Sequence, residues 1–114
     1  MLLQTLSILA SLQTCEVSVY SDCFHGRRTA SGEIFDQRKM TCAVNRGMVK
    51  EFPFGTKVAI FFRGRRVIVK VTDTGSYKPK KSRHWFDLSK AAMKKLLGEN
   101  YNTRIKAEWK KHTK

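Results

Sequence analysis

The stretch KVAIFFRGRRVIVKVTDTG, residues 57–75, carries the clearest structural signal in the chain. Its first part, up to the arginine-glycine pair, favours a strand, and residues 66–72, rich in β-branched side chains, favour a second strand. Arg63 and Gly64 join the two, and glycine adopts the positive φ that a tight hairpin turn requires. We therefore predict a β-hairpin that ends at Asp73, a carboxylate entering a turn, where functional groups are common.

Weaker signals on both sides of the hairpin predict more short strands. Alternating polar and apolar residues, or short apolar runs, mark four segments: residues 16–20, 40–44, 84–87 and 103–109. Residues 25–32 are polar and contain glycine, which is typical of a loop. Several short strands with one helix late in the chain are typical of a small, mostly β barrel.

The single helix is expected after residue 87. Ser89 or Asp87 would cap it, because either side chain can accept a hydrogen bond from the first turn. Gly98 would end it as a C′ glycine. The apolar residues expected on its buried side are Leu88, Ala91, Ala92, Met93 and Leu96. Asp87 therefore has two possible roles, a helix cap and a functional carboxylate.

The composition indicates one domain with a strongly basic surface. The chain has 114 residues, enough for a hydrophobic core of its own. Its 23 Lys and Arg against 9 Asp and Glu give a net charge of +14, which attracts polyanions. Lys and Arg abundance is the only sign of nucleic-acid binding, so we expect no specific nucleic-acid partner.

Three cysteines, Cys15, Cys23 and Cys42, lack C-x-x-C spacing, so we expect no metal site and no cofactor. The odd count leaves at least one thiol unpaired in a monomer. A Cys23–Cys42 bridge is possible in an oxidising compartment, and burial as small apolar side chains is the alternative.

The N-terminal residues 1–14 are rich in Leu and Ile and contain no charged side chain. They indicate the apolar part of a secretory signal or a short amphipathic helix. The stretch is too short to span a bilayer, so we expect no stable membrane insertion. We expect a signal or apolar segment over residues 1–15, a barrel domain over 16–110 and a basic tail over 111–114, in a monomeric protein.

Four segments also match, in order, the motifs of one family. They are FHGRRTASGEIFD at residues 24–36, FPFGTKV at 52–58, GRRVIVKVTD at 64–73 and DLSKAA at 87–92. On these motifs the chain resembles the RlpA-like double-psi β-barrel family, which is related to MltA-type lytic transglycosylases and to expansins. The resemblance implies a mostly β fold, a six-stranded double-psi β-barrel with one short helix after residue 87.

The resemblance also implies a lytic transglycosylase that cuts peptidoglycan glycan, with a preference for strands stripped of stem peptides. Glycosidic cleavage needs a proton for the leaving oxygen. One acid/base can suffice in this class, because the sugar's own 6-hydroxyl attacks. Asp73 is the candidate acid/base, and Asp87 the candidate partner or substrate-orienting carboxylate.

Further residues are candidates for substrate binding. Aromatic rings can stack on the apolar faces of sugars, although packing in the core is the alternative. A histidine can hydrogen-bond substrate or a loop, and an arginine can clamp a carboxylate or lie free on the surface. The candidates are Tyr20, Phe24, His25, Arg27, Thr74 and Trp85.

One departure from the family pattern leaves two functions open. The family motif T-A-A-H is replaced by TCAV, so that Val44 stands where the family has a histidine, and extra residues follow. The lost histidine favours a non-catalytic expansin-like or barwin-like module that binds wall polysaccharide, whereas the retained Asp73 favours the enzyme. In both cases we expect a secreted, periplasmic or cell-envelope protein, bacterial or phage-encoded, that binds peptidoglycan or another anionic wall polysaccharide.

Overall fold

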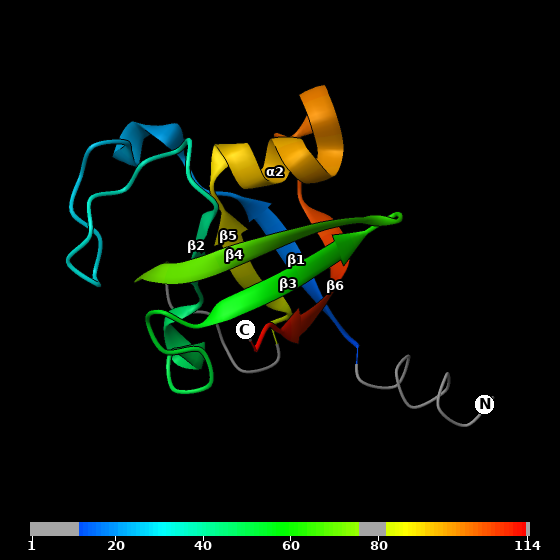
Figure 1. The fold of residues 1–114 in the computed structure, drawn as a ribbon, viewed down its shortest axis with the longest axis horizontal. Helices are drawn as coiled ribbons and strands as arrows, with labels where there is room; N and C mark the ends of the chain where they lie inside the picture. Colours follow the sequence, from blue (N-terminus) through cyan, green and yellow to red (C-terminus); the bar gives the residue numbers. More distant parts are fainter. Residues whose placement is uncertain (1–11, 76–81, 114) are drawn as a thin grey trace.

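The computed structural model describes residues 12–75 and 82–113 (Figure 1). Within these residues lie six strands: β1 (Gln13–Val19), β2 (Thr41–Val44), β3 (Lys57–Phe62), β4 (Arg65–Thr74), β5 (His84–Leu88) and β6 (Ile105–Lys111). The α-helix is α2 (Lys90–Leu97), and the short 3-10 helices are η1 (Asp22–Phe24), η2 (Arg46–Met48) and η3 (Gly98–Asn100). The strands, helix and hairpin predicted from the sequence are all present within a few residues of their expected ends.

The six described strands close into a barrel in the order β1-β5-β2-β4-β3-β6. β1 pairs with β5, and β2 with β4, in parallel, although each pair is far apart in the sequence. The remaining neighbours are antiparallel. Closure leaves no free sheet edge and confirms the predicted six-stranded barrel with its one helix.

The predicted hairpin is formed by β3 and β4, the green strands that cross the barrel in Figure 1. Arg63 and Gly64 both have positive φ, 49° and 80°, which is the backbone of the tight turn expected there. β4 continues to Thr74, past the expected end at residue 72. Asp73 therefore lies within the strand, opposite Ala43 of β2, and not in a turn.

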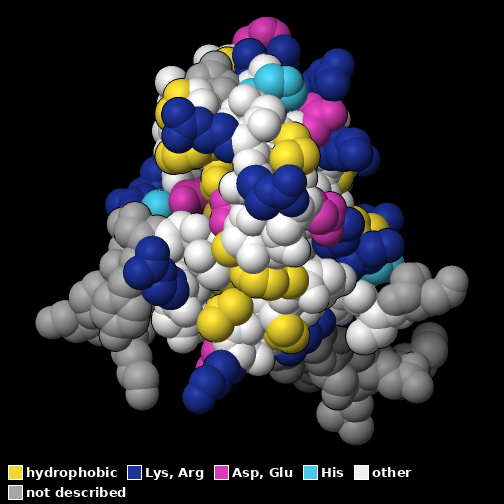
Figure 2. Space-filling model, turned by 90° about the vertical axis from the view of Figure 1, so that its left-hand side faces the viewer, with side chains coloured by type: hydrophobic (Ala, Val, Ile, Leu, Met, Phe, Trp, Pro, Cys, Tyr) yellow, Lys and Arg dark blue, Asp and Glu magenta, His cyan; other side chains and the backbone are white. Residues whose placement is uncertain are grey.

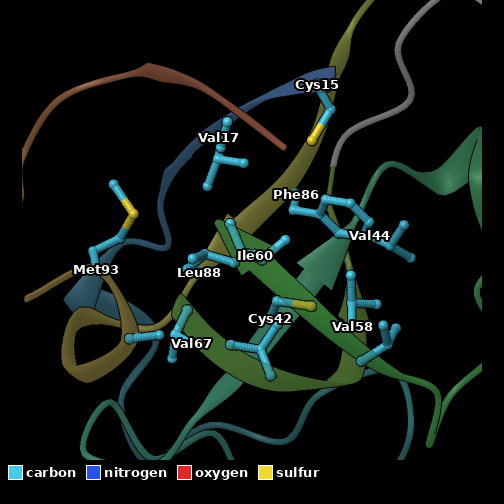
Figure 3. Packing of buried hydrophobic residues seen from close by; sticks show 14 of the residues in the cluster. Cys15, Val17, Cys42, Val44, Val58, Ile60, Val67, Phe86, Leu88 and Met93 are labelled. Atoms are coloured by element: carbon cyan, nitrogen blue, oxygen red, sulfur yellow. The ribbon is translucent and has the colours of Figure 1, made fainter. Parts of the chain in front are cut away.

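The hydrophobic core fills the inside of the barrel (Figure 3). Alternate residues of β4, namely Val67, Val69 and Val71, point inward and are essentially inaccessible to solvent. The helix α2 covers one end of the barrel, and its buried residues are Ala92, Met93 and Leu96. Of the other two residues expected on its buried side, Ala91 is half-buried and Leu88 is buried as part of β5.

Ser89 alone caps the helix. Its Oγ accepts a hydrogen bond from the Ala92 N–H at 3.3 Å and donates one to the Lys39 carbonyl at 2.6 Å. Gly98, with φ 70°, ends the helix as predicted. The capping role considered for Asp87 is therefore filled by its neighbour, and its carboxylate is available for other contacts.

The expected segment 1–15 lies mostly outside the described residues. β1 begins at Gln13, upstream of the expected domain start, and β6 ends at Lys111. No helix among the described residues is long and apolar enough to cross a bilayer.

All three cysteines are free thiols, so the Cys23–Cys42 bridge is not formed. Cys15 and Cys42 lie inside the barrel (Figure 3), whereas Cys23 is exposed. Burial raises the pKa of Cys15 to about 12 and also raises that of Cys42. The alternative of small buried apolar side chains is the correct one for these two residues.

This arrangement predicts one fast-reacting thiol in the native protein. Because the thiolate is the reactive form, Cys23 should react with an aromatic disulfide reagent at about pH 8, while Cys15 and Cys42 should not. Unfolding in guanidinium should release all three cysteines, counted by absorbance. Fast labelling of a natively folded Cys23→Ser variant would contradict the burial of the other two.

Candidate functional site

A cleft of about 720 Å³ lies where β1, β4 and β5 meet the loop between β1 and β2, residues 20–40. Asp73 and Asp87 both line it. Figure 2, which views the side of the molecule where this loop lies in Figure 1, shows Lys and Arg side chains spread between smaller acidic and hydrophobic patches. The two carboxylates predicted from the sequence are therefore brought to one open site.

The strand order explains this meeting. β2 lies between β4 and β5, and its Ala43 is in register with Asp73 on one side and Asp87 on the other. Neighbouring strands are about 4.8 Å apart, so the two aspartate backbones lie about 10 Å apart. Because Ala43 has only a methyl side chain, it leaves room for both carboxylates.

A β-bulge turns Asp73 toward the cleft. In the pairing of β2 with β4, Cys42 faces Val71 and Ala43 faces Asp73, so Thr72 is an extra residue in β4. Strict alternation after Val71 would place Asp73 inside the barrel. The bulge places Thr72 in a buried position and leaves Asp73 half-exposed.

Protein donors engage both oxygens of Asp73. The Tyr20 hydroxyl donates to Oδ2. The backbone N–H groups of Ala30 and Thr74 donate to Oδ1, at 2.9 and 2.8 Å. The carboxylate is thus held jointly by the end of β1, by the loop and by its own strand.

Tyr20 is fixed by aromatic neighbours. Its ring lies 4.5 Å from that of Phe35 and 5.3 Å from that of Phe24, measured between centroids. Burial and the hydrogen bond to Asp73 raise the pKa of Tyr20 far above its ordinary value. Its phenol therefore stays protonated and acts as the donor to Asp73.

Asp87 sits in a second hydrogen-bonded group. Its Oδ1 accepts from the Ser18 hydroxyl at 2.5 Å and lies 2.8 Å from His84 Nε2. A Cβ added to Gly75 would lie 3.3 Å from Oδ2, so the backbone directly after β4 approaches this carboxylate closely. Ser18 and His84 also line the cleft, and neither was predicted from the sequence.

A second bulge explains why His84 reaches this side. β1 pairs Glu16 with His84 and Val17 with Phe86, which leaves Trp85 as an extra residue in β5. Simple alternation would group His84 with the buried Phe86 and Leu88 instead. The sequence HWFD at residues 84–87 was the only signal that could have identified His84, and it gives no sign that Trp85 forms a bulge.

The other predicted site residues divide into two groups. Phe24, Arg27 and Thr74 line the cleft together with Tyr20. His25 and Trp85 do not belong to its described lining. The His25 Nδ1 accepts a hydrogen bond from the Gln37 N–H at 3.1 Å, a contact within the loop.

The Trp85 side chain instead packs against neighbouring side chains. Its ring lies 5.7 Å from that of Trp109, with the Arg83 guanidinium 5.0 Å from its centroid, and its indole N–H donates to the Ser82 carbonyl. The basic stretch KPKKSR, residues 78–83, falls largely outside the described residues, apart from Ser82 and Arg83.

Val44 contributes to the core and not to the cleft. It is fully buried and pairs with Thr74 and Phe86. The extra residues that follow it form η2, whose Arg46 lines the cleft. Where the family pattern has a histidine, this chain thus has an apolar core residue and, two positions later, an arginine at the site.

The arrangement suits an extended, polar ligand. It combines two carboxylates, an exposed aromatic ring at Phe24, and three arginines that line the same cleft: Arg27, Arg28 and Arg46. Such a site can stack a sugar ring, bind anionic groups and exchange a proton. Among the described residues, no cluster of three His, Cys, Asp or Glu side chains could hold a metal ion.

Sequence comparisons identify relatives across most of the chain. A family model described as lytic transglycolase matches residues 13–106. The probable endolytic peptidoglycan transglycosylase RlpA of Aquifex aeolicus is 46% identical over 81 residues, covering 69% of this chain and 32% of the relative. The endolytic peptidoglycan transglycosylase RlpA of Pseudomonas aeruginosa is 39% identical over 92 residues, covering 80% of this chain and 25% of the relative. The chain thus spans about a third or less of these curated relatives.

Solved structures share the barrel. A Streptomyces papain inhibitor superposes with a TM-score of 0.68 at 24% identity, covering 90% of this chain and 94% of the inhibitor. The apo form of an expansin from Clavibacter michiganensis gives a TM-score of 0.67 at 20% identity, covering 90% of this chain and half (50%) of the expansin. At these identities the likeness concerns the fold alone.

The raised pKa of Tyr20 predicts a pH dependence of stability. In the unfolded chain the phenol ionises near its ordinary pKa of 10.0, whereas in the folded protein it stays protonated to higher pH. The free energy of unfolding should therefore fall as pH rises from about 10 to 12, and fall less steeply in Tyr20→Phe. The difference should stay below about 1.4 kcal/mol per pH unit, since Tyr20 is only partly shielded from solvent. Urea denaturation at each pH measures it, and parallel curves for both proteins would contradict it.

Proposed function

Because this chain belongs to the lytic transglycolase family of double-psi β-barrels, we propose that it cuts the glycan strands of peptidoglycan as a lytic transglycosylase. The observation that carries the proposal is the meeting of Asp73 and Asp87 in one cleft beside an exposed aromatic ring. The names of the relatives support peptidoglycan as the polymer.

Asp73 is the proposed acid/base. Its carboxylic acid gives a proton to the glycosidic oxygen as the bond from that oxygen to the anomeric carbon breaks. The 6-hydroxyl of the same sugar forms the new bond to the anomeric carbon, and its proton returns to the Asp73 carboxylate. Between these steps the Tyr20 hydroxyl and the two backbone N–H groups stabilise the negative charge on Asp73.

Asp87 is the proposed partner. A carboxylate across Ala43 from the acid/base can offset the positive charge that develops on the sugar ring in an oxocarbenium-like transition state. It can also accept a hydrogen bond from a sugar hydroxyl. Phe24, 40% exposed, offers its ring for stacking at the edge of the same cleft.

The arginines of the cleft support an anionic polysaccharide as the ligand. Arg27, Arg28 and Arg46 line it, on a protein with a net charge of +14. The Arg28 guanidinium donates to the Gly32 carbonyl at 2.7 Å, which orients it. Carboxylates carried by the glycan would pair with these side chains. We place the protein outside the cytoplasmic membrane, where this polymer lies, and expect it to act as a monomer.

The second candidate is a wall-binding module without catalysis. It is favoured by Val44, whose burial in the core leaves the cleft without the histidine of the family motif. An expansin mutant from Clavibacter michiganensis, which shares this fold over half (50%) of its chain, was solved in complex with cellohexaose. The two candidates share the cleft and differ in whether a bond is broken.

Substitution of Asp73 separates the two candidates. Wild-type protein should release anhydro-sugar ends from purified glycan strands, detected by mass spectrometry, and Asp73→Asn should reduce the rate at least about 100-fold. Asp36→Asn is the matched control, because Asp36 pairs with Arg38 at 2.9 Å outside the cleft lining. Glycan binding without any anhydro ends from the wild type would establish the binding module, and a fully active Asp73→Asn would remove Asp73 from the mechanism.

The charge of the ligand is testable with Arg46. Chemical reduction of the glycan carboxyl groups to alcohols should weaken binding to the wild type by about tenfold at low salt. The Arg46→Gln variant should bind intact and reduced glycan with more nearly equal affinity. Arg63→Gln, in the hairpin turn with its guanidinium over the Phe62 ring, serves as the control and should keep the full preference. Equal affinity of the wild type for both glycans would contradict the anionic ligand.

A further inference from the structure

His84 lines the cleft, yet the proposed reaction does not use it. Both of its ring nitrogens have partners. Nε2 lies 2.8 Å from Asp87 Oδ1 and 2.8 Å from the Ser18 hydroxyl. Nδ1 lies 2.5 Å from Nη2 of Arg104.

These partners fix the position of the ring proton. An arginine guanidinium can only donate hydrogen bonds, so Nδ1 of His84 must accept. A neutral imidazole that accepts at Nδ1 carries its proton on Nε2. That N–H therefore faces Asp87 Oδ1 and the Ser18 hydroxyl oxygen, which lie at the same distance, while the Ser18 hydroxyl itself donates to Oδ1.

The donor to His84 is itself held in place. Nε of Arg104 lies 3.4 Å from a carboxylate oxygen of Glu16. Glu16 on β1 is in register with His84 on β5. Arg104 immediately precedes β6, which pairs with the other side of β1. A chain of polar contacts thus runs from Glu16 through Arg104 and His84 to Asp87, across three neighbouring strands.

This chain of contacts occupies one oxygen of Asp87 and leaves the other without a hydrogen-bond donor among the described residues. Oδ1 receives the two side-chain donors. Oδ2 lies beside Gly75, which follows β4 directly and also lines the cleft. Because both nitrogens of His84 are engaged within the protein, the ring is not placed to replace the family histidine as an acid or base.

We propose that His84 is a positioning residue: its Nε2–H, set by Arg104, holds the Asp87 carboxylate so that Oδ2 faces the glycan. The proposal rests on the proposed function, since Asp87 is given its role there. His84 is only 12% exposed in its side chain, so its orientation is set by the protein and not by solvent.

A double-mutant cycle tests the positioning role. His84→Phe keeps the ring but loses the donor, and should lower kcat/KM for glycan cleavage about 10- to 100-fold. His84→Gln, whose amide N–H can reach toward Asp87, should restore most of that loss. In an Asp87→Ala background His84→Phe should have little further effect, because it acts through Asp87. His112→Phe, outside the cleft lining, is the matched control and should be fully active.

A readout independent of activity completes the test. The ¹⁵N chemical shifts of the imidazole should identify the Nε2–H tautomer of His84 in the wild type, and in Arg104→Met the Nδ1 resonance should shift because that nitrogen loses its hydrogen-bond donor. Thermal denaturation checks that each variant is folded, and the tautomer of His84 in the wild type still tests the proposal if His84→Phe does not fold. A full effect of His84→Phe in the Asp87→Ala background, or an Nδ1–H wild type, would overturn the proposal.

Failure of the proposed cleavage gives a different pattern. A wild type that releases no anhydro ends would overturn the lytic reaction, and the same cycle would then be measured on glycan affinity. Coupling between His84 and Asp87 in binding, with the Nε2–H tautomer, would support the positioning role in a binding module. If the losses of glycan affinity caused by His84→Phe and Asp87→Ala are additive, the positioning role is wrong.

Discussion

Two β-bulges determine which side chains of β4 and β5 point out of the barrel toward the cleft. A barrel of this size turns every second side chain of a strand inward, and Val67, Val69 and Val71 follow that rule. Thr72 interrupts it, so that Asp73 leaves the interior, and Trp85 interrupts it in β5 beside His84. Without these extra residues the carboxylate would be buried among valines, at a desolvation cost that the core offers nothing to offset. The positions of Asp73 and His84 therefore depend on these two breaks in strand register more than on any single side-chain contact.

The loop between β1 and β2 is then a support for Asp73 as much as a wall of the cleft. The Ala30 N–H donates to the Asp73 carboxylate, and the Ser31 N–H donates to the Thr72 carbonyl at the bulge itself. Thr29 is buried and bonds to the Glu33 carbonyl through its hydroxyl, which closes the loop on itself. The TASGE part of the family-like motif thus holds the carboxylate in place, while Phe24 and Arg27, earlier in the same motif, line the cleft.

Local patterns were enough to predict the strands, the hairpin and the helix end at Gly98, because each depends on neighbouring residues. The motif resemblance and the ends of the strands also pointed to Asp73 and Asp87. What could not be predicted depends on register between distant strands. Ser18 meets Asp87 only through the pairing of β1 with β5. His84 lies three residues before Asp87 on β5 and reaches the same side because of the bulge at Trp85, which leaves no mark in the sequence. From the sequence alone, Trp85 was a candidate for stacking on a sugar ring, but in the structure its ring packs against that of Trp109.

The position of Val44 in the barrel suits an apolar residue, where the family motif has a histidine. Val44 lies between Thr74 and Phe86 at the end of β2, with its side chain in the core, so an apolar residue there adds burial without needing a hydrogen-bond partner. The polar chemistry of the cleft is supplied from neighbouring positions, by Arg46 in the added turn and by the chain of contacts from Glu16 to Asp87. A cation near two carboxylates suits the binding of an anionic glycan, whereas the reaction we propose leaves proton transfer to Asp73 alone. A single acid/base is compatible with a reaction whose nucleophile is a hydroxyl of the substrate, and for that reason the loss of the histidine does not by itself exclude catalysis.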